Sequence, residues 1–289
     1  MLKINLSIKN SNIPSNTIGI DMGQSLTKIA YLDENNLNLL SLSTQKGIPE
    51  IKKFIESKKT SDSNFNFTGG RCFKLFKEYS NEIQVNIFNE FEAIIKGIEY
   101  LYLLEKNKKL LSSLVVTMGT GTSIVLQREI FKHLGGSSMG GGFFMGIIKL
   151  FFDLNNFSEA VSLAKKGNRY NVDLKVSDIY DSEDIRVDNL FREFTAASLG
   201  KIEYNFDKNT INTEDFLNSL ICAIGENIGT IATLMAETHN VIKIVFSGGF
   251  LRDNRPLKRI LSLLCNVKRK KAIFLKNSEF SAAIGAMLL

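Results

Sequence analysis

Residues 17–32 read TIGIDMGQSLTKIAYL, and this stretch decides the fold. Its two ends, 17–21 and 26–32, are rich in β-branched and aromatic residues. The four residues between them, 22–25, include a glycine and a serine, which are typical of a turn. The stretch therefore predicts two short strands joined by a tight turn.

The same layout returns further along the chain. Residues 114–127, LVVTMGTGTSIVLQ, contain two strand-like runs around the turn Gly119-Thr120-Gly121. A repeated strand–turn–strand unit predicts two related halves that meet at a cleft. We place the boundary near 110–113, which gives an N-terminal domain of residues 1–111 and a C-terminal domain of residues 112–289.

Helical patterns alternate with strand patterns along the rest of the chain. From 89 to 106, apolar residues such as Phe91, Ile94 and Ile98 recur every three or four positions, as on one face of a helix. Alternating strands and helices predict an α/β protein. Further helices are expected at 54–59, 143–154, 158–166, 216–238 and 282–289, and further strands at 64–68, 241–246 and 272–275.

Composition indicates a soluble globular protein and excludes several other classes. Apolar residues make up 44% and charged residues 23% of the 289, and 36 basic against 30 acidic residues give a net charge of +6. This excess, and the short basic run 268–271 without aromatic neighbours, are too weak to predict nucleic-acid binding. Three scattered cysteines without CxxC spacing predict reduced thiols and no zinc site. Without a signal-peptide core or an apolar run of ~18 residues, we expect a cytoplasmic location and no membrane partner.

Three glycine-containing turns are candidates for phosphate binding: Asp21-Met22-Gly23, Gly119-Thr120-Gly121 and Ser247-Gly248-Gly249. Glycine lets backbone N–H groups approach an anion without a Cβ in the way. Neither GxxxxGK[ST] nor a helix-opening GxGxxG is present. One such turn alone is more often an ordinary hairpin. Three of them, with Asp21 and Lys28, favour a nucleotide site, because a carboxylate can hold Mg²⁺ through water and a lysine can neutralise a phosphoryl group in transfer.

Four motifs in order make the pattern specific. IGIDMGQSLTKIAYLDE at 18–34 resembles the first phosphate motif of the superfamily of actin, sugar kinases and heat-shock chaperones. TMGTGTSIVL at 117–126 resembles its second phosphate motif, and VFSGGFLR at 245–252 its adenosine motif. HLGGSSMGGGFFMG at 133–146 is similar to the glycine-rich signature of type II (eukaryotic-like) pantothenate kinases. The resemblance runs from about residue 17 to 289. It implies two ribonuclease H-like domains with an interdomain nucleotide cleft.

The resemblance also implies an activity. A protein of this family uses ATP and Mg²⁺ to phosphorylate pantothenate to 4′-phosphopantothenate, the first step of coenzyme A synthesis, and forms a homodimer. Glu90 takes the place of the general base, whereas its position alone fits equally well a carboxylate that offsets a helix dipole. Asp21 would hold the metal, Lys28 would lie near the γ-phosphate, and Thr120 and Ser123 would contact pantothenate.

The implied nucleotide contacts gather in the glycine turns. Gly140 to Gly142 would offer N–H groups at the start of a helix, or else form a hinge between domains. Gly248 and Gly249 would lie against the adenine or ribose. The full set of implied nucleotide-binding residues is Gly23, Gln24, Ser25, Gly119, Thr120, Gly121, Gly140, Gly141, Gly142, Gly248 and Gly249.

Two departures from the family pattern leave alternatives open. His133 stands where the family has an arginine that helps hold pantothenate, and histidine lacks the planar fork of donors that arginine always carries. Gln24-Ser25 replaces the small residues of the first phosphate turn. The alternatives are a kinase of the same superfamily with a pantetheine-like or aminosugar acceptor, and a nucleotide- or coenzyme A-binding sensor that has lost catalysis.

Overall fold

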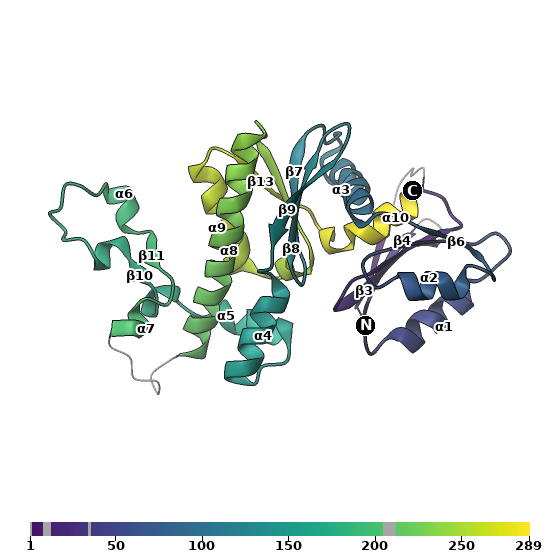
Figure 1. Ribbon diagram of the computed structural model, residues 1–289, viewed down its shortest axis with the longest axis horizontal. Coiled ribbons are helices and arrows are strands. Elements are labelled where there is room, and N and C mark those ends of the chain that lie inside the picture. The colour runs from purple at the N-terminus through teal and green to yellow at the C-terminus, as the bar shows by residue number, and fades with distance from the viewer. Residues whose placement is uncertain (1, 8–12, 34–35, 205–211) are drawn as a thin grey trace.

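The computed structural model describes residues 2–7, 13–33, 36–204 and 212–289. Two sheet-containing halves lie side by side, and a smaller lobe made by residues 168–204 extends from the second half (Figure 1). The mixed α/β class predicted from the sequence is confirmed.

Each half is built on one mixed sheet. The first sheet has the order β1-β4-β3-β2-β5-β6 and the second the order β13-β12-β7-β8-β9. A two-stranded ribbon of β10 and β11 lies in the small lobe. The strand bounds are β1 Leu2–Ser7, β2 Thr17–Met22, β3 Leu26–Asp33, β4 Asn36–Ser43, β5 Asn64–Thr68, β6 Gln84–Ile87, β7 Ser113–Met118, β8 Thr122–Gln127, β9 Lys132–Ser137, β10 Leu174–Lys175, β11 Thr195–Ala197, β12 Lys243–Ser247 and β13 Lys271–Phe274.

The two sheets repeat one another strand for strand. From β4 through β3, β2 and β5 to β6, the pairings are antiparallel twice and then parallel twice. From β9 through β8, β7 and β12 to β13, the same series occurs. The repetition predicted from two hairpins therefore extends to five strands in each half, and β1 is an addition to the first sheet alone.

The helices form layers around the two sheets. The helix bounds are α1 Ile48–Lys58, α2 Phe73–Tyr79, α3 Glu90–Lys106, α4 Gly141–Phe152, α5 Phe157–Ala164, α6 Asn189–Arg192, α7 Lys201–Tyr204, α8 Thr213–Thr238, α9 Arg255–Val267 and α10 Ser281–Leu288. Helices α1 and α2 cover the outer face of the first sheet, α3 and α10 fill the space between the sheets, and α8 and α9 cover the outer face of the second sheet. The helix expected at 54–59 begins earlier, because Pro49 is accommodated in its first turn.

Helices α3 and α10 cross at backbone contact. A Cβ on Gly97 of α3 would lie 1.8 Å from the Ser281 carbonyl oxygen, and one on Gly285 of α10 would lie 1.7 Å from that of Ala93. The chain therefore ends by returning to the first half, where α10 also packs on β2. The predicted boundary at 111/112 falls between α3 and β7, but the last helix of the predicted second domain packs against elements of the first.

Helix α8 is the one described helix long and apolar enough, by length and composition, to cross a membrane. The sequence expectation concerned an unbroken apolar run, whereas α8 meets a criterion of mean hydropathy with Glu226 inside its apolar window. However, 61% of the apolar window is buried inside the fold, where α8 packs on α5 and α9. We therefore interpret α8 as a core helix of the second half.

Charged residues connect α8 to the small lobe. The buried Arg169 guanidinium donates to Asp173 at 2.5 Å and to both carboxylate oxygens of Glu226 on α8, at 2.7 and 3.1 Å. Although burial alone opposes charging of Arg169, its hydrogen bonds to Glu226 and Asp173 raise its pKa. A buried charge is tolerated in a protein when it is paired in this way.

Candidate functional site

Asp21 and Lys28 form an ion pair at the end of the first phosphate hairpin. Asp21 on β2 faces Lys28 on β3 in the strand register, and its Oδ2 lies 3.2 Å from the Lys28 Nζ. The Asp21 side chain is 6% exposed and that of Lys28 16%. The structure therefore brings these two predicted site residues into direct contact.

Glu90 begins the helix between the two sheets. Asn89 caps α3 by accepting hydrogen bonds from the N–H groups of Phe91 and Glu92, which fixes the first turn that carries Glu90. Glu90 remains accessible to solvent. The surrounding protein raises its pKa by desolvation, Asp21 raises it further by repulsion, and Lys28 lowers it. The three predicted catalytic residues therefore interact electrostatically.

Cys72 lies against the same group of residues. Its thiol is buried, and burial raises its pKa to about 11, with further contributions from the charges of Asp21 and Glu90. A thiol in this state is protonated at neutral pH and is a poor nucleophile. We therefore give Cys72 a packing role beside the carboxylates.

One hydrogen bond joins the two phosphate turns across the halves. The Ser25 and Thr120 hydroxyl oxygens lie 3.1 Å apart. Within the second turn, the Gly119 N–H donates to the Gly121 carbonyl at 2.8 Å. The turns of the two repeated strand–turn–strand units therefore lie in contact. We predicted that the two halves meet at a cleft in this region.

Gly140 to Gly142 pack directly on the second phosphate turn. The Gly141 N–H donates to the Gly119 carbonyl at 2.8 Å, and the Gly142 N–H donates to the Thr120 carbonyl at 2.9 Å. The expectation that these two N–H groups are offered to a nucleotide is therefore wrong in this structure, because the chain itself already uses them. A Cβ on Gly142 would lie 2.5 Å from the Thr120 methyl, so close packing explains the glycine.

The two glycines of the adenosine motif differ in their surroundings. Gly248 has a φ of +104°, and a Cβ there would lie 2.4 Å from the Met118 carbonyl oxygen. Its lack of a side chain is therefore required by the neighbouring strand β7. A Cβ on Gly249 would meet nothing within 4 Å. Open space at Gly249 leaves room for a ligand, and contact with adenine or ribose stays a prediction there.

His133 lies on β9 and stacks on Phe91, the residue after Glu90. The two ring centroids are 4.2 Å apart and the planes differ by 12°. Ser123 lies on the adjacent strand β8, opposite Gly136 of β9. The structure therefore brings His133 to the start of α3. Phe91 was predicted as a helix residue but not as the partner of His133.

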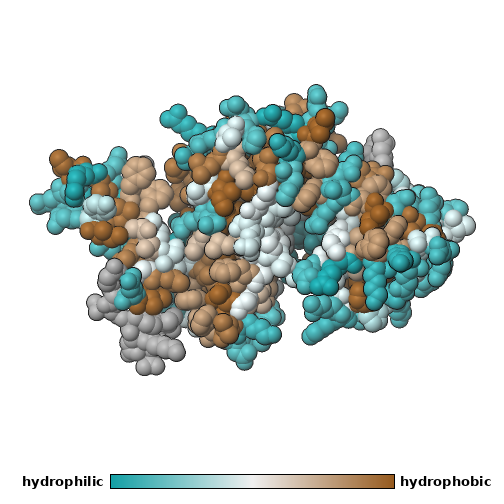
Figure 2. Space-filling model, in the orientation of Figure 1, coloured by the Kyte–Doolittle hydropathy of each residue, from teal (hydrophilic) through white to brown (hydrophobic). Residues whose placement is uncertain are grey.

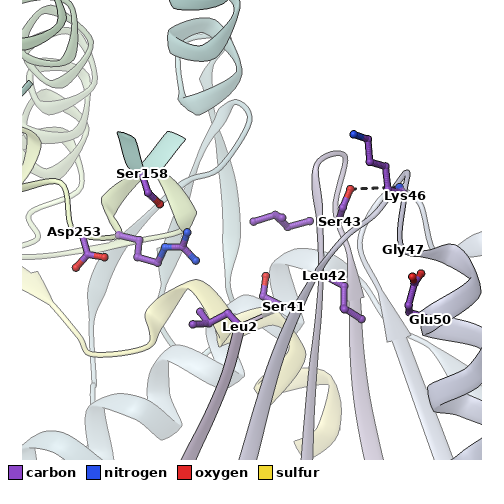
Figure 3. A pocket seen from close by; sticks show the side chains of 11 residues that line it. Leu2, Ser41, Leu42, Ser43, Lys46, Gly47, Glu50, Ser158 and Asp253 are labelled. Atoms are coloured by element: carbon purple, nitrogen blue, oxygen red, sulfur yellow. Dashed lines mark hydrogen bonds between the residues drawn. The ribbon is translucent and has the colours of Figure 1, made fainter. Parts of the chain in front are cut away.

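Two further features near the site were not predicted. Arg71 donates from Nε to the Gln24 side-chain oxygen at 2.7 Å, so a residue after β5 contacts the first phosphate turn. A cavity of about 870 Å³ opens between the halves. Ser43, Lys46 and Glu50 lie on one side of it and Ser158 and Asp253 on the other (Figure 3). Its lining also includes Leu26, next to the first phosphate turn, and Arg252, the last residue of the adenosine motif.

Paired sheets with hairpins that meet across a cleft define a class of protein, the actin-like two-domain ATPase fold. Solved structures agree with this class. The activator of 2-hydroxyisocaproyl-CoA dehydratase from Clostridium difficile, with bound ADPNP, has a TM-score of 0.63 at 15% identity and covers 94% of this chain and 92% of its own. A ROK family glucokinase from Streptomyces griseus, in complex with glucose and AMPPNP, has a TM-score of 0.54 at 12% identity, with 94% and 97% covered.

Sequence comparison identifies the family within this class. The Fumble family model matches residues 17–289. A type II pantothenate kinase from Bacillus cereus (strain AH820) is 35% identical over 280 residues, which cover 94% of this chain and 96% of the relative. One from Oceanobacillus iheyensis is 34% identical, with 94% and 98% covered. The chain belongs to the Fumble family of type II pantothenate kinases.

Proposed function

We propose that this protein transfers the γ-phosphate of ATP to the primary hydroxyl of pantothenate, which gives 4′-phosphopantothenate at the first step of coenzyme A synthesis. One observation carries the proposal. The charges of the Asp21–Lys28 ion pair act on Glu90, beside the two phosphate turns that the Ser25–Thr120 hydrogen bond joins. The relatives that are named type II pantothenate kinases and the ATP analogues in the structural neighbours support it.

Each residue of the site has a task in this reaction. Glu90 accepts the proton of the pantothenate hydroxyl as its oxygen attacks the γ-phosphorus. Lys28 offsets the negative charge that spreads over the transferred phosphoryl group. Thr120 and Ser123 supply hydroxyl groups that orient the acceptor. The open space at Gly249 of the adenosine motif leaves room for the adenine or ribose of ATP.

The residues present fit a magnesium ion. Among the described residues, no group of three or more His, Cys, Asp or Glu side chains lies close enough to hold a metal by itself. Mg²⁺ usually keeps several waters and binds one or two carboxylates together with the substrate phosphates. The nearly buried Asp21 carboxylate at the end of β2 can serve as that ligand. When bound, the metal would offset the charge on the phosphates.

Mass spectrometry of pantothenate incubated with the purified protein, ATP and Mg²⁺ tests the proposal. We expect a mass gain of one phosphate, and no gain when the protein is omitted. ATP binding without a product would contradict the proposal and favour the sensor alternative.

His133 motivates the other candidate, a kinase with an altered acceptor. Its ring is stacked on Phe91. It stands at the position where the family has an arginine, whose guanidinium is always charged. We expect His133→Arg to lower the pantothenate KM severalfold while the ATP KM stays unchanged, because a guanidinium adds charge-assisted hydrogen bonds to a carboxylate. Lys132→Arg on the same strand is the matched control. An unchanged pantothenate KM in His133→Arg would show that position 133 does not contact the acceptor.

We also propose that the enzyme is a soluble cytoplasmic homodimer, with α4 in the interface. Phe143, Leu150 and Phe151 of this helix are exposed, at 39%, 76% and 65%. Hydrophobic surface gathers in the region of α4 and α5 (Figure 2). The long apolar helix α8 is mostly covered by its own half and offers less free apolar surface for such a contact. Leu150→Glu should therefore halve the molar mass measured by light scattering. Ile242→Glu, at another exposed apolar residue, should leave it unchanged. A monomeric parent protein would contradict the proposal.

A further inference from the structure

Arg71 is built into the first phosphate turn by both its backbone and its side chain. Its backbone N–H donates to the Met22 carbonyl at 2.9 Å, and its Nε donates to the Gln24 side-chain oxygen at 2.7 Å. The segment before it is packed just as closely. Gly69 has a φ of +90°, and a Cβ there would lie 2.6 Å from the Asp21 Oδ1. Arg71 is therefore held at the turn that carries Asp21.

The charge of Arg71 is uncompensated, unlike that of Lys28. Lys28 is paired with Asp21 at 3.2 Å, so much of its charge is offset before any ligand binds. Arg71 contacts a neutral amide, and no ion pair in the described part of the chain joins it to a carboxylate. Its side chain is exposed, and no hydrogen bond within the described residues engages its Nη1 or Nη2. A guanidinium with free donors at a phosphate turn matches the geometry of a phosphoryl oxygen pair.

We propose that Arg71 binds the terminal phosphate of ATP, and that Gln24 holds the guanidinium by its Nε so that both Nη groups face the nucleotide. This inference rests on the proposed ATP-dependent function and adds a residue outside the predicted site. It also gives a task to Gln24, which replaces the small residue usual in this turn: its amide positions the arginine without neutralising it.

Nucleotide affinity tests the role of Arg71 without relying on turnover. ADP lacks the terminal phosphate, so the ratio of the Kd values for ADP and a non-hydrolysable ATP analogue, both with Mg²⁺, isolates contacts to that group. We expect Arg71→Gln to raise the Kd for the analogue by about tenfold or more, the size of a lost charge-assisted hydrogen bond. The Kd for ADP should rise by less than about twofold. Gln24→Ala should also raise the Kd for the analogue, but by a smaller factor. Combined with Arg71→Gln in a double variant, it should cause little further increase.

Arg128→Gln is the matched control, because Arg128 is also exposed and hydrogen-bonded, but to the His239 carbonyl near the far end of β8. It should change neither Kd. An equal loss of affinity for both nucleotides in Arg71→Gln would indicate a merely structural role and would overturn the inference. Unchanged affinity for both nucleotides would overturn it as well. If the parent protein discriminates ATP from ADP through Arg71 but does not phosphorylate pantothenate, the proposed acceptor is wrong and Arg71 stands. If the parent binds neither nucleotide, both proposals fail.

Discussion

Replacing Glu90 with glutamine should reduce kcat by about 10² to 10⁴-fold, the range that general base catalysis contributes. Glutamine keeps the size of the side chain and cannot accept the hydroxyl proton. The Kd for an ATP analogue should change by less than about twofold, because the phosphate turns are untouched. No ion pair within the described residues involves Glu90, and the repulsion from Asp21 opposes the attraction of Lys28, so the protein should stay as stable as the parent. Coupled-assay kinetics and nucleotide titration measure both quantities.

Glu92→Gln provides the control for this experiment. Glu92 is two residues away on the same helix, about 200° around its axis, and it is exposed. It should keep nearly full activity. Equal losses in the two variants would indicate a general effect of charge near the start of α3. Undiminished turnover in Glu90→Gln would rule out Glu90 as the base.

The pH profile gives an independent readout of the same residue. The base must be ionised to work, and desolvation together with Asp21 raises the pKa of Glu90 above its ordinary 4.5. Activity should therefore fall as the pH drops through a midpoint above 4.5. This acidic limb should be absent from the residual activity of Glu90→Gln.

Local patterns were sufficient to predict the phosphate hairpins and the start of α3. Strand alternation around a glycine turn is determined by neighbouring residues, and so is the Asn89 cap. In contrast, the contacts that assemble the site join residues far apart in the sequence: Arg71 with Gln24, Phe91 with His133, and Ser25 with Thr120. Nothing local to either partner indicates such a pair, because the packing of the two sheets decides it.

Strand β9 was not predicted, for a related reason that concerns its glycines. The stretch around Gly135 and Gly136 carries little strand propensity and was not predicted as β9. The structure uses a strand there because it approaches β8 so closely that a Cβ on Gly136 would lie 2.0 Å from the Thr122 carbonyl oxygen. The glycine that weakens the local pattern is thus the residue that the tertiary contact requires.

The crossing of α3 and α10 should be the most sensitive point of the fold. In Gly97→Ala, the new Cβ would meet the Ser281 carbonyl oxygen at 1.8 Å and its carbonyl carbon at 2.6 Å. Both atoms are backbone, so no side chain can rotate away and the helices must separate. Overpacking of this kind costs about 1–3 kcal/mol or more, which exceeds the ~0.5–1 kcal/mol that alanine gains over glycine inside a helix. The free energy of unfolding, measured in urea, should fall.

Gly146→Ala makes the same change inside another helix, but it should raise the free energy of unfolding. Gly146 lies in α4, and a Cβ there would meet nothing within 4 Å. Helix propensity alone then acts, and the protein should gain up to ~1 kcal/mol. Equal effects of the two substitutions would contradict the close crossing.

Gly97→Ala should also reduce kcat in the molecules that remain folded, because α3 carries Glu90 at its first position. A displacement of about 1 Å in a reacting group can cost roughly 10²-fold in rate. Turnover measured well below the melting temperature, where the variant is fully folded, separates this loss from unfolding. A variant that is destabilised but retains full kcat would show that α10 supports the fold without positioning the base. A joint loss would make the last helix of the chain part of what positions the catalytic carboxylate.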